Sequence, residues 1–200
     1  MPGKRRGKII AVVGGIATGK STLAKLLAGK LKAHLLQEQF KDNPYLKDLY
    51  TKGSKSFENY IWFFNFALKR YNTALRLKQA GKTAVLDTAV TITPEMYRQL
   101  YFRGYDAALL KDFLANTVGH LPLPDVTIFL TGRDEFILKR LRQRGRKVES
   151  NLSEETVKKL NALYSRAATK YKGRILQVDI EAGDFNSERV LLEIVARLNQ

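Results

Sequence analysis

A glycine-rich segment near the N-terminus, GGIATGKS at residues 14–21, carries the clearest chemistry in the sequence. It matches the pattern G-x-x-x-x-G-K-[ST], in which glycines let successive backbone N–H groups curl around an anion. The next helix adds the partial positive charge of its N-terminus, Lys20 adds a full charge, and Ser21 can bind a magnesium ion that bridges phosphates. We therefore predict a mononucleotide site. The residues expected around the phosphates are Gly14, Gly15, Ile16, Ala17, Thr18, Gly19, Lys20, Ser21 and Thr22.

The flanking segments supply the context that this motif requires. Residues 9–13, IIAVV, form a continuous apolar run, which is typical of a strand buried on both faces. Residues 20–32 carry leucines at helical spacing. A glycine-rich turn with an incidental lysine is the alternative explanation, but a strand before the loop and a helix after it favour phosphate binding.

Strands and helices alternate along the whole chain. The predicted strands are 9–13, 34–37, 84–86, 126–130 and 175–178. The predicted helices are 20–32, 56–80, 94–117, 134–144, 153–171 and a last one that begins at Asn186 or Ser187. Such alternation is typical of a parallel sheet covered by helices on both faces. We expect an α/β fold with a five-stranded parallel sheet, in a single domain over residues 1–200 with a basic leader at 1–7.

The composition excludes several kinds of site. The chain has 200 residues and no cysteine, which rules out disulfides, thiolate zinc sites and cysteine nucleophiles. Because it has only two histidines, a histidine-rich metal site is also excluded. Its 35 Lys and Arg against 19 Asp and Glu give a net charge of +16, so polyanions are the expected partners. A nucleotide-handling enzyme with many solvated lysines is favoured over a nucleic-acid-binding protein. No apolar stretch reaches the roughly 18 residues of a membrane span, so we expect a soluble cytoplasmic protein with no membrane partner.

Four stretches resemble the deoxynucleoside kinases, a family of P-loop kinases, and particularly their bacterial deoxyadenosine/deoxyguanosine-type members. They are QEQFKDNPYLKDLY at 37–50, VLDT at 85–88, LKRLRQRGRKVES at 138–150 and ILQVDIEAGDF at 175–185. The resemblance touches most of the chain. It implies a P-loop kinase fold with an arginine-rich lid, a homodimer, and magnesium-dependent transfer of the γ-phosphate of ATP to the 5′-hydroxyl of a nucleoside.

On the acceptor side, the resemblance makes Glu38 the general base that takes the proton from the 5′-hydroxyl. A carboxylate at the carboxyl end of a strand, facing a phosphate loop, is well placed for that role. A surface carboxylate after a short strand is the alternative. The resemblance also implies that Tyr50 and Glu149 bind the sugar 3′-hydroxyl, and that Asp184 and Phe185 approach the adenine of ATP.

The basic segment LKRLRQRGRK resembles the family lid. Arg140, Arg144 and Arg146 fall on the lid arginines, which neutralise charge during phosphoryl transfer. Arg140 and Arg144 are one helical turn apart and can face one anion, although a solvated basic face has the same spacing. Glu38, Lys20, Arg140 and Arg144 form the predicted catalytic set.

Two positions depart from the family pattern. In the family, the acidic residue after the third strand is followed by arginine and serine, and that arginine contacts both the base carboxylate and the phosphates; here the residues are Asp87, Thr88 and Ala89. Asp87 remains suited to magnesium, directly or through water. The family also has a glutamine in the long helix that binds the nucleobase, where this chain has Trp62 or Phe63. Neither can pair with a base edge, but both can stack on a base, and Trp62 can equally be a core residue.

Two other activities stay open at this point. A thymidylate-like nucleoside monophosphate kinase would use the arginines after the third strand, Arg98 and Arg103, to bind an acceptor that already carries phosphate. A nucleic-acid-binding or polynucleotide-acting P-loop protein would use the net charge of +16. Both alternatives keep the phosphate loop and change only the acceptor.

Overall fold

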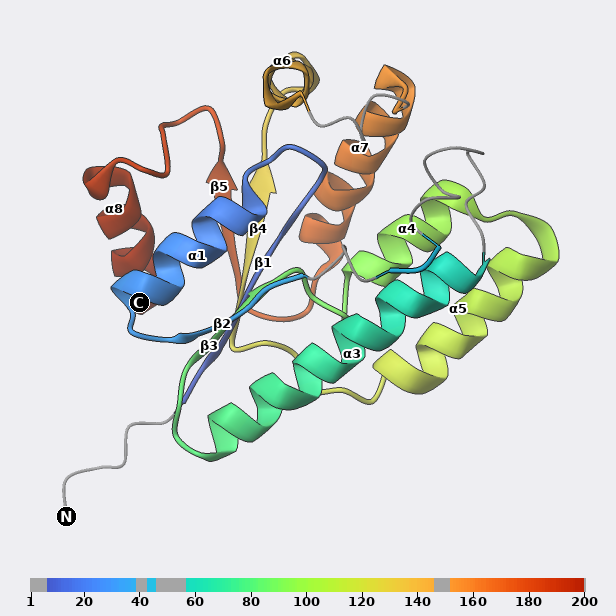
Figure 1. The fold of residues 1–200 in the computed structure, drawn as a ribbon, viewed down its shortest axis with the longest axis horizontal. Coiled ribbons are helices and arrows are strands. Elements are labelled where there is room, and N and C mark those ends of the chain that lie inside the picture. Colours follow the sequence, from blue (N-terminus) through green and yellow to red (C-terminus); the bar gives the residue numbers. More distant parts are fainter. Residues whose placement is uncertain (1–6, 39–42, 46–56, 146–151, 200) are drawn as a thin grey trace.

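A five-stranded parallel sheet forms the centre of the fold (Figure 1). The structure, a computed structural model, describes residues 7–38, 43–45, 57–145 and 152–199. The strands are β1 (Ile9–Gly14), β2 (His34–Leu36), β3 (Ala84–Asp87), β4 (Val126–Thr131) and β5 (Ile175–Asp179), in the order β2-β3-β1-β4-β5. The predicted α/β fold is therefore confirmed, and every strand end lies within one residue of its predicted position.

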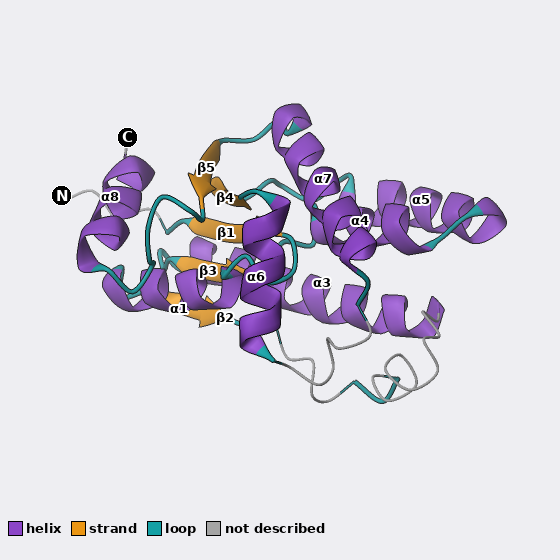
Figure 2. Ribbon diagram, turned by 90° about the horizontal axis from the view of Figure 1, so that it is seen from above, coloured by secondary structure: helices purple, strands orange, loops and turns teal. Residues whose placement is uncertain are grey.

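Helices cover both faces of the sheet. Those in the described residues are α1 (Lys20–Lys30), α3 (Phe57–Gln79), α4 (Thr93–Tyr101), α5 (Gly104–Val118), α6 (Asp134–Arg144), α7 (Glu154–Lys170) and α8 (Glu188–Asn199). α1 and α8 pack on one face, and α3, α4 and α7 pack on the other (Figure 1). Figure 2 shows α5 beside α4, away from the sheet, and α6 above the carboxyl ends of the strands.

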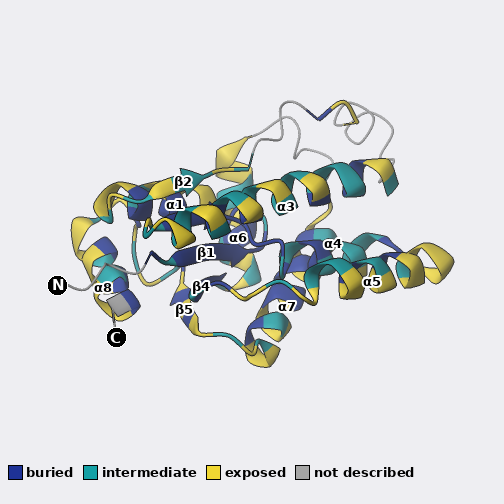
Figure 3. Ribbon diagram, turned by 90° about the horizontal axis from the view of Figure 1, so that it is seen from below, coloured by how far each residue is buried: buried dark blue, intermediate teal, exposed yellow. Residues whose placement is uncertain are grey.

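β1 lies in the middle of the sheet and is buried along its whole length. Ile10 and Val12 point into the layer under α1 and α8, whereas Ile9, Ala11 and Val13 point into the layer under α3 and α7. Figure 3 shows this strand as a fully buried element and places the exposed residues on the outer faces of the helices. Because helices cover both layers, the strand carries an unbroken apolar run instead of an alternating one.

One predicted helix is two helices in the structure. The pattern predicts a single helix at 94–117, but α4 and α5 are separated by Phe102 and Arg103, which are both extended, and Gly104 follows with a φ of 56°. The buried ring of Phe102 packs edge-on against Tyr60, with ring centroids 5.3 Å apart. The helix is therefore interrupted so that this aromatic side chain can enter a small core cluster.

Two expectations are only partly addressed by the structure. The predicted basic leader, apart from Gly7, lies outside the described residues. Among the helices that the structure does describe, none combines the length and the apolar character that crossing a lipid bilayer would require.

Shortening a core side chain of α1 should destabilise the fold. Leu27 of α1 is fully buried, whereas Leu192 of α8 is 45% exposed. We expect Leu27→Ala to lower the free energy of unfolding by about 2–5 kcal/mol, because it leaves a cavity against the sheet, and Leu192→Ala to lower it by less than about 1 kcal/mol. Urea unfolding followed by circular dichroism measures both values. Equal losses in the two variants would contradict the described packing of α1.

Candidate active site

The phosphate loop follows β1 and leads into α1, as the sequence predicts. Gly14 ends β1, and a Cβ at this position would lie 2.8 Å from the backbone oxygen of Leu130, so the neighbouring strand leaves no space for a side chain. Gly19 has a φ of 95°, and a Cβ there would lie 3.1 Å from the Phe185 ring and 3.2 Å from a guanidinium nitrogen of Arg140. Glycine is thus required at Gly19 both by its backbone conformation and by the close approach of two side chains.

Side chains of the loop hold its own backbone. Thr18 Oγ1 donates a hydrogen bond to the carbonyl oxygen of Gly15 over 2.9 Å, and Lys20 Nζ donates to the same oxygen over 2.6 Å. Thr18 is fully buried, whereas Ser21 and Thr22 are exposed in the first turn of α1. The loop therefore keeps a curved shape and exposes the positive end of a helix, where an anion is stabilised.

Two of the residues predicted to bind ATP lie against the phosphate loop. Arg140 of α6 and Phe185, between β5 and α8, both approach Gly19 from outside the loop. Phe185 is buried in the core under α1. The carboxylate of Asp184 accepts a hydrogen bond from the backbone amide of Asn186 over 3.0 Å, so it shapes the turn before α8.

Other residues predicted for the lid and the sugar are less well defined. Arg144 is exposed in the last turn of α6, and Gly145, with a φ of 57°, ends that helix. Arg146, Glu149 and Tyr50 lie outside the described residues. Their functional roles stay predictions.

The carboxyl ends of β2, β3 and β1 bring together the residues predicted to bind the phosphate acceptor. Leu36 of β2 pairs with Leu86 of β3, and Asp87 of β3 pairs with Val12 of β1. The parallel strands β2, β3 and β1 therefore end side by side, which places Glu38, Asp87 and the phosphate loop at one edge of the sheet. This edge is where open α/β sheets bind ligands.

Arg70 of α3 lies between Glu38 and β3. Its Nη1 donates a hydrogen bond to the backbone oxygen of Asp87 over 2.7 Å, and its Nη2 donates to Thr88 Oγ1 over 3.2 Å. The same Nη2 lies 4.0 Å from Glu38 Oε1. Sequence reasoning did not single out this arginine. The available signal was a basic residue within a long, largely apolar helix.

The surroundings of Glu38 change its acidity. Burial has the largest effect and raises the pKa of the Glu38 carboxyl above its ordinary value of 4.5; the charge of Arg70 lowers this pKa, Asp87 raises it, and Lys20 lowers it. The net direction is upward. A carboxylate with a raised pKa beside a phosphate loop is suited to accept a proton from a hydroxyl group.

Asp87 has the properties of a magnesium ligand. It is 2% exposed at the end of β3, and its Oδ1 has no hydrogen-bond partner among the described residues. A buried carboxylate oxygen without a partner is costly, and a cation or its water shell would satisfy it. The described part of the chain contains no cluster of three or more acidic, histidine or cysteine ligands. The residues thus fit an ion held mainly by phosphate and water oxygens, with Ser21 and Asp87 as the protein groups.

The two aromatic candidates for base binding are successive residues of α3, and their rings meet edge to face with centroids 5.3 Å apart. Trp62 stacks on Phe66 with ring centroids 4.2 Å apart, and exposed Lys69 lies over the Phe66 ring. Phe63 is half-buried and stands two helical turns before Arg70, so both project from one face of the helix. Helix geometry therefore places Phe63, and not Trp62, on the face that carries the arginine of the site.

A pair of buried amides ties the segment after β2 to α3. Asn43 Nδ2 donates a hydrogen bond to Asn59 Oδ1 over 2.6 Å, and both residues are buried. The backbone amide of Tyr45 donates to Asn43 Oδ1 over 2.9 Å. Asn59 is one helical turn before Phe63 on α3, so its side chain lies on the same face of the helix as Phe63 and Arg70. The sequence analysis did not identify this contact, because nothing in the local pattern shows which amides meet.

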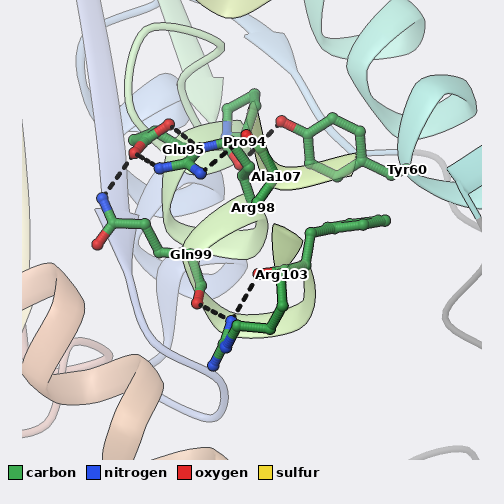
Figure 4. A network of polar contacts seen from close by, with 8 residues as sticks. Tyr60, Pro94, Glu95, Arg98, Gln99, Arg103 and Ala107 are labelled. Atoms are coloured by element: carbon green, nitrogen blue, oxygen red, sulfur yellow. Dashed lines mark hydrogen bonds and ion pairs between the residues drawn. The ribbon is translucent and has the colours of Figure 1, made fainter. Parts of the chain in front are cut away.

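The arginines proposed for a phosphorylated acceptor are engaged elsewhere (Figure 4). Arg98 binds Glu95 through Nε (2.7 Å) and Nη2 (2.6 Å), and its Nη1 donates to the backbone oxygen of Ala107 over 3.1 Å. Arg103 donates to the backbone oxygen of Gln99 over 2.8 Å. These contacts join α4 to α5, so they explain both arginines without an acceptor phosphate.

Comparison with known proteins identifies the family of the chain. The family model described as "Deoxynucleoside kinase" matches residues 10–200. The chain is 28% identical over 206 residues to the deoxyadenosine/deoxycytidine kinase of Bacillus subtilis (strain 168), covering 96% of this chain and 92% of the relative. It is 26% identical over 195 residues to the deoxyguanosine kinase of the same organism, covering 88% of each.

The fold also matches solved structures. A deoxyadenosine kinase from M. mycoides with bound dCMP and dCDP superposes with a TM-score of 0.83 at 24% identity, covering 96% of this chain and 98% of that one. The structure of that kinase with dATP gives a TM-score of 0.82, again at 24% identity, and covers 96% of this chain and all of that one. The family match extends over nearly the whole chain, and it confirms the resemblance seen in the sequence. The chain therefore belongs to the deoxynucleoside kinase family and is a nucleoside kinase.

Proposed function

We propose that this protein transfers the γ-phosphate of ATP to the 5′-hydroxyl of a deoxynucleoside, with Glu38 as the general base. The observation that carries this proposal is the position of Glu38 at the same sheet edge as the phosphate loop, close enough for the charge of Lys20 to lower its pKa. A base on one side of a site and a phosphate cradle on the other is the arrangement that phosphoryl transfer to a hydroxyl needs.

In this reaction the nucleoside 5′-oxygen attacks the γ-phosphorus, and its proton passes to the Glu38 carboxylate. The bond from the γ-phosphorus to the oxygen that bridges it to the β-phosphate breaks, and ADP leaves. Lys20 and the backbone N–H groups of the loop orient the phosphates of ATP. Arg140, next to Gly19, is placed to face the charge that develops on the transferring group, and we assign Arg144 to the same role. A magnesium ion held by Ser21 and Asp87 would add positive charge beside the phosphates.

The nucleobase meets an aromatic surface in this proposal. Phe63 shares its helix face with Arg70 and cannot form the paired hydrogen bonds of an amide. Base stacking is tolerant of base identity because every base has a π-face. We therefore propose a deoxynucleoside acceptor with broad base preference, a range that matches the names of the relatives, which include kinases of deoxyadenosine, deoxycytidine and deoxyguanosine.

The two alternative functions gain no specific support. Arg98 and Arg103 bind Glu95 and backbone oxygens instead of lining the acceptor side, so a monophosphate acceptor has no arginine assigned to it. Nucleic-acid binding rests on the net charge of +16 alone. A homodimer and a nucleic-acid partner both stay predictions from sequence.

Removing the base carboxylate should abolish most turnover. We expect Glu38→Gln to lower kcat by about 10²–10⁴-fold, because the amide cannot accept the 5′-hydroxyl proton, and to leave ATP binding within about twofold. The control is Glu193→Gln on α8, where the carboxylate is exposed. Monophosphate formation over a panel of deoxynucleosides and ribonucleosides gives kcat, and calorimetry gives ATP affinity. Undiminished turnover in Glu38→Gln would show that another group is the base.

The same carboxylate should set the acid limb of the pH profile. Burial raises the pKa of Glu38 above 4.5, so kcat/KM should fall as the pH drops through this raised pKa, since the protonated acid cannot act as a base. The charged or titratable groups around it are Arg70 of α3, Lys20 of α1, Asp87 of β3 and Tyr164 of α7. Rates from pH 4 to 9 measure the limb. A limb that persists unchanged in Glu38→Gln would assign it to a different group.

The two aromatic residues of α3 should differ in their effect on nucleoside binding. We expect Phe63→Ala to raise the KM of every deoxynucleoside by about tenfold, in line with the loss of one stacking contact, with ATP KM unchanged. Trp62→Ala removes a ring that stacks on Phe66 and meets Phe63 only at its edge, and it should change nucleoside KM by less than about threefold. Initial rates with each acceptor test both variants. A larger effect from Trp62→Ala would reverse the assignment.

A further inference from the structure

A guanidinium reaches the acceptor side of the site from α3, not from the end of β3. The segment at the end of β3 reads Asp87-Thr88-Ala89 and contains no arginine. The guanidinium of Arg70, on α3, donates hydrogen bonds to the backbone oxygen of Asp87 (2.7 Å) and to the hydroxyl oxygen of Thr88 (3.2 Å). The end of β3 thus binds an arginine that another element supplies.

Both ends of this contact are fixed by their surroundings. Tyr71, the next residue of α3, is fully buried, and its hydroxyl donates a hydrogen bond to the backbone oxygen of Pro122. Thr88 has a φ of 78°, in the left-handed region that β-branched residues rarely adopt, and its N–H donates to the Val12 backbone oxygen over 3.1 Å. Such backbone strain persists only where surrounding contacts hold it. The hydrogen bond from Arg70 is one of these contacts.

Stability alone does not account for an arginine at this position. The Arg70 side chain is 12% exposed, and its Nε has no hydrogen-bond partner among the described residues. A buried charged group with incomplete hydrogen bonding often stabilises a protein less than an apolar side chain of similar size. Its Nη2 faces Glu38 Oε1 at 4.0 Å. The charge therefore acts on the carboxylate that the proposed reaction uses.

We propose that Arg70 is a positioning residue for Glu38: anchored to β3 by two hydrogen bonds, it holds the carboxylate in the orientation that receives the proton of the 5′-hydroxyl. The inference rests on the proposed function, in which Glu38 is the base. It assigns the positioning of the Glu38 carboxylate to a side chain of α3. The helix that faces the nucleobase through Phe63 then also sets the geometry of the proton acceptor.

A double-mutant cycle separates positioning from a structural role. We expect Arg70→Met to lower kcat by about 10–10²-fold, while ATP KM changes by less than about twofold. In a Glu38→Gln background the same substitution should lower kcat by less than about threefold, because the group that Arg70 positions is already gone. The matched control is Arg76→Met, an exposed arginine on the same helix, which should keep wild-type kcat in both backgrounds.

The outcomes distinguish this inference from the proposed function. An equal loss from Arg70→Met in both backgrounds, or wild-type kcat in the single variant, would overturn the positioning role. Full activity of Glu38→Gln would instead overturn the assignment of the base. Arg70→Lys keeps a positive charge and should recover part of kcat. If thermal unfolding shows that Arg70→Met does not fold, Arg70→Lys and Arg70→Gln are measured in both backgrounds by the same criterion.

Discussion

The parallel register of β2, β3 and β1 is the constraint on which the site depends. Because Leu36 pairs with Leu86 and Val12 pairs with Asp87, the three strands end next to one another. Each strand then positions a different group at the same edge: Glu38, the proposed base, after β2, the carboxylate of Asp87 at the end of β3, and the phosphate loop after β1. If one strand shifted its register by one residue, each of its side chains would point into the opposite layer of the core. The apolar packing that stabilises the sheet therefore also fixes the positions of the site residues.

Helix α3 also fixes the chain segments at this edge of the sheet. One side of the helix buries Phe64, Tyr71 and Ala74 in the core. The adjacent face carries Asn59, which binds the segment after β2, and Arg70, which binds the end of β3. The helix therefore connects the two chain segments that carry the acceptor chemistry. Polar residues in a largely apolar helix cost stability unless they are satisfied, and both of these form hydrogen bonds to the segments they hold.

The charges of the site are balanced around one carboxylate. Burial and Asp87 make it harder for Glu38 to carry a negative charge, whereas Arg70 and Lys20 make it easier. Such opposing effects keep a half-buried acid ionisable and still basic enough to accept a proton. The charge of the Asp87 carboxylate raises the Glu38 pKa. The Asp87 backbone oxygen accepts a hydrogen bond from Arg70, while its Oδ1 has no hydrogen-bond partner among the described residues.

Local pattern in the sequence determined a large part of this protein. Apolar runs predicted all five strands, and the spacing of Gly14, Gly19 and Lys20 identified the phosphate loop, because burial period and backbone freedom are properties of short segments. The sequence pattern did not predict the break between α4 and α5, since this break depends on the packing of the Phe102 ring against Tyr60 of α3. Arg70 was missed for the same kind of reason. It is 17 residues before Asp87 and 32 after Glu38 along the chain, and only the packing of α3 across β3 brings the three together. The sequence by itself identified the loop that we expect to hold phosphate, and the tertiary structure decided which cation faces Glu38, because contacts between distant segments leave no periodic trace in the chain.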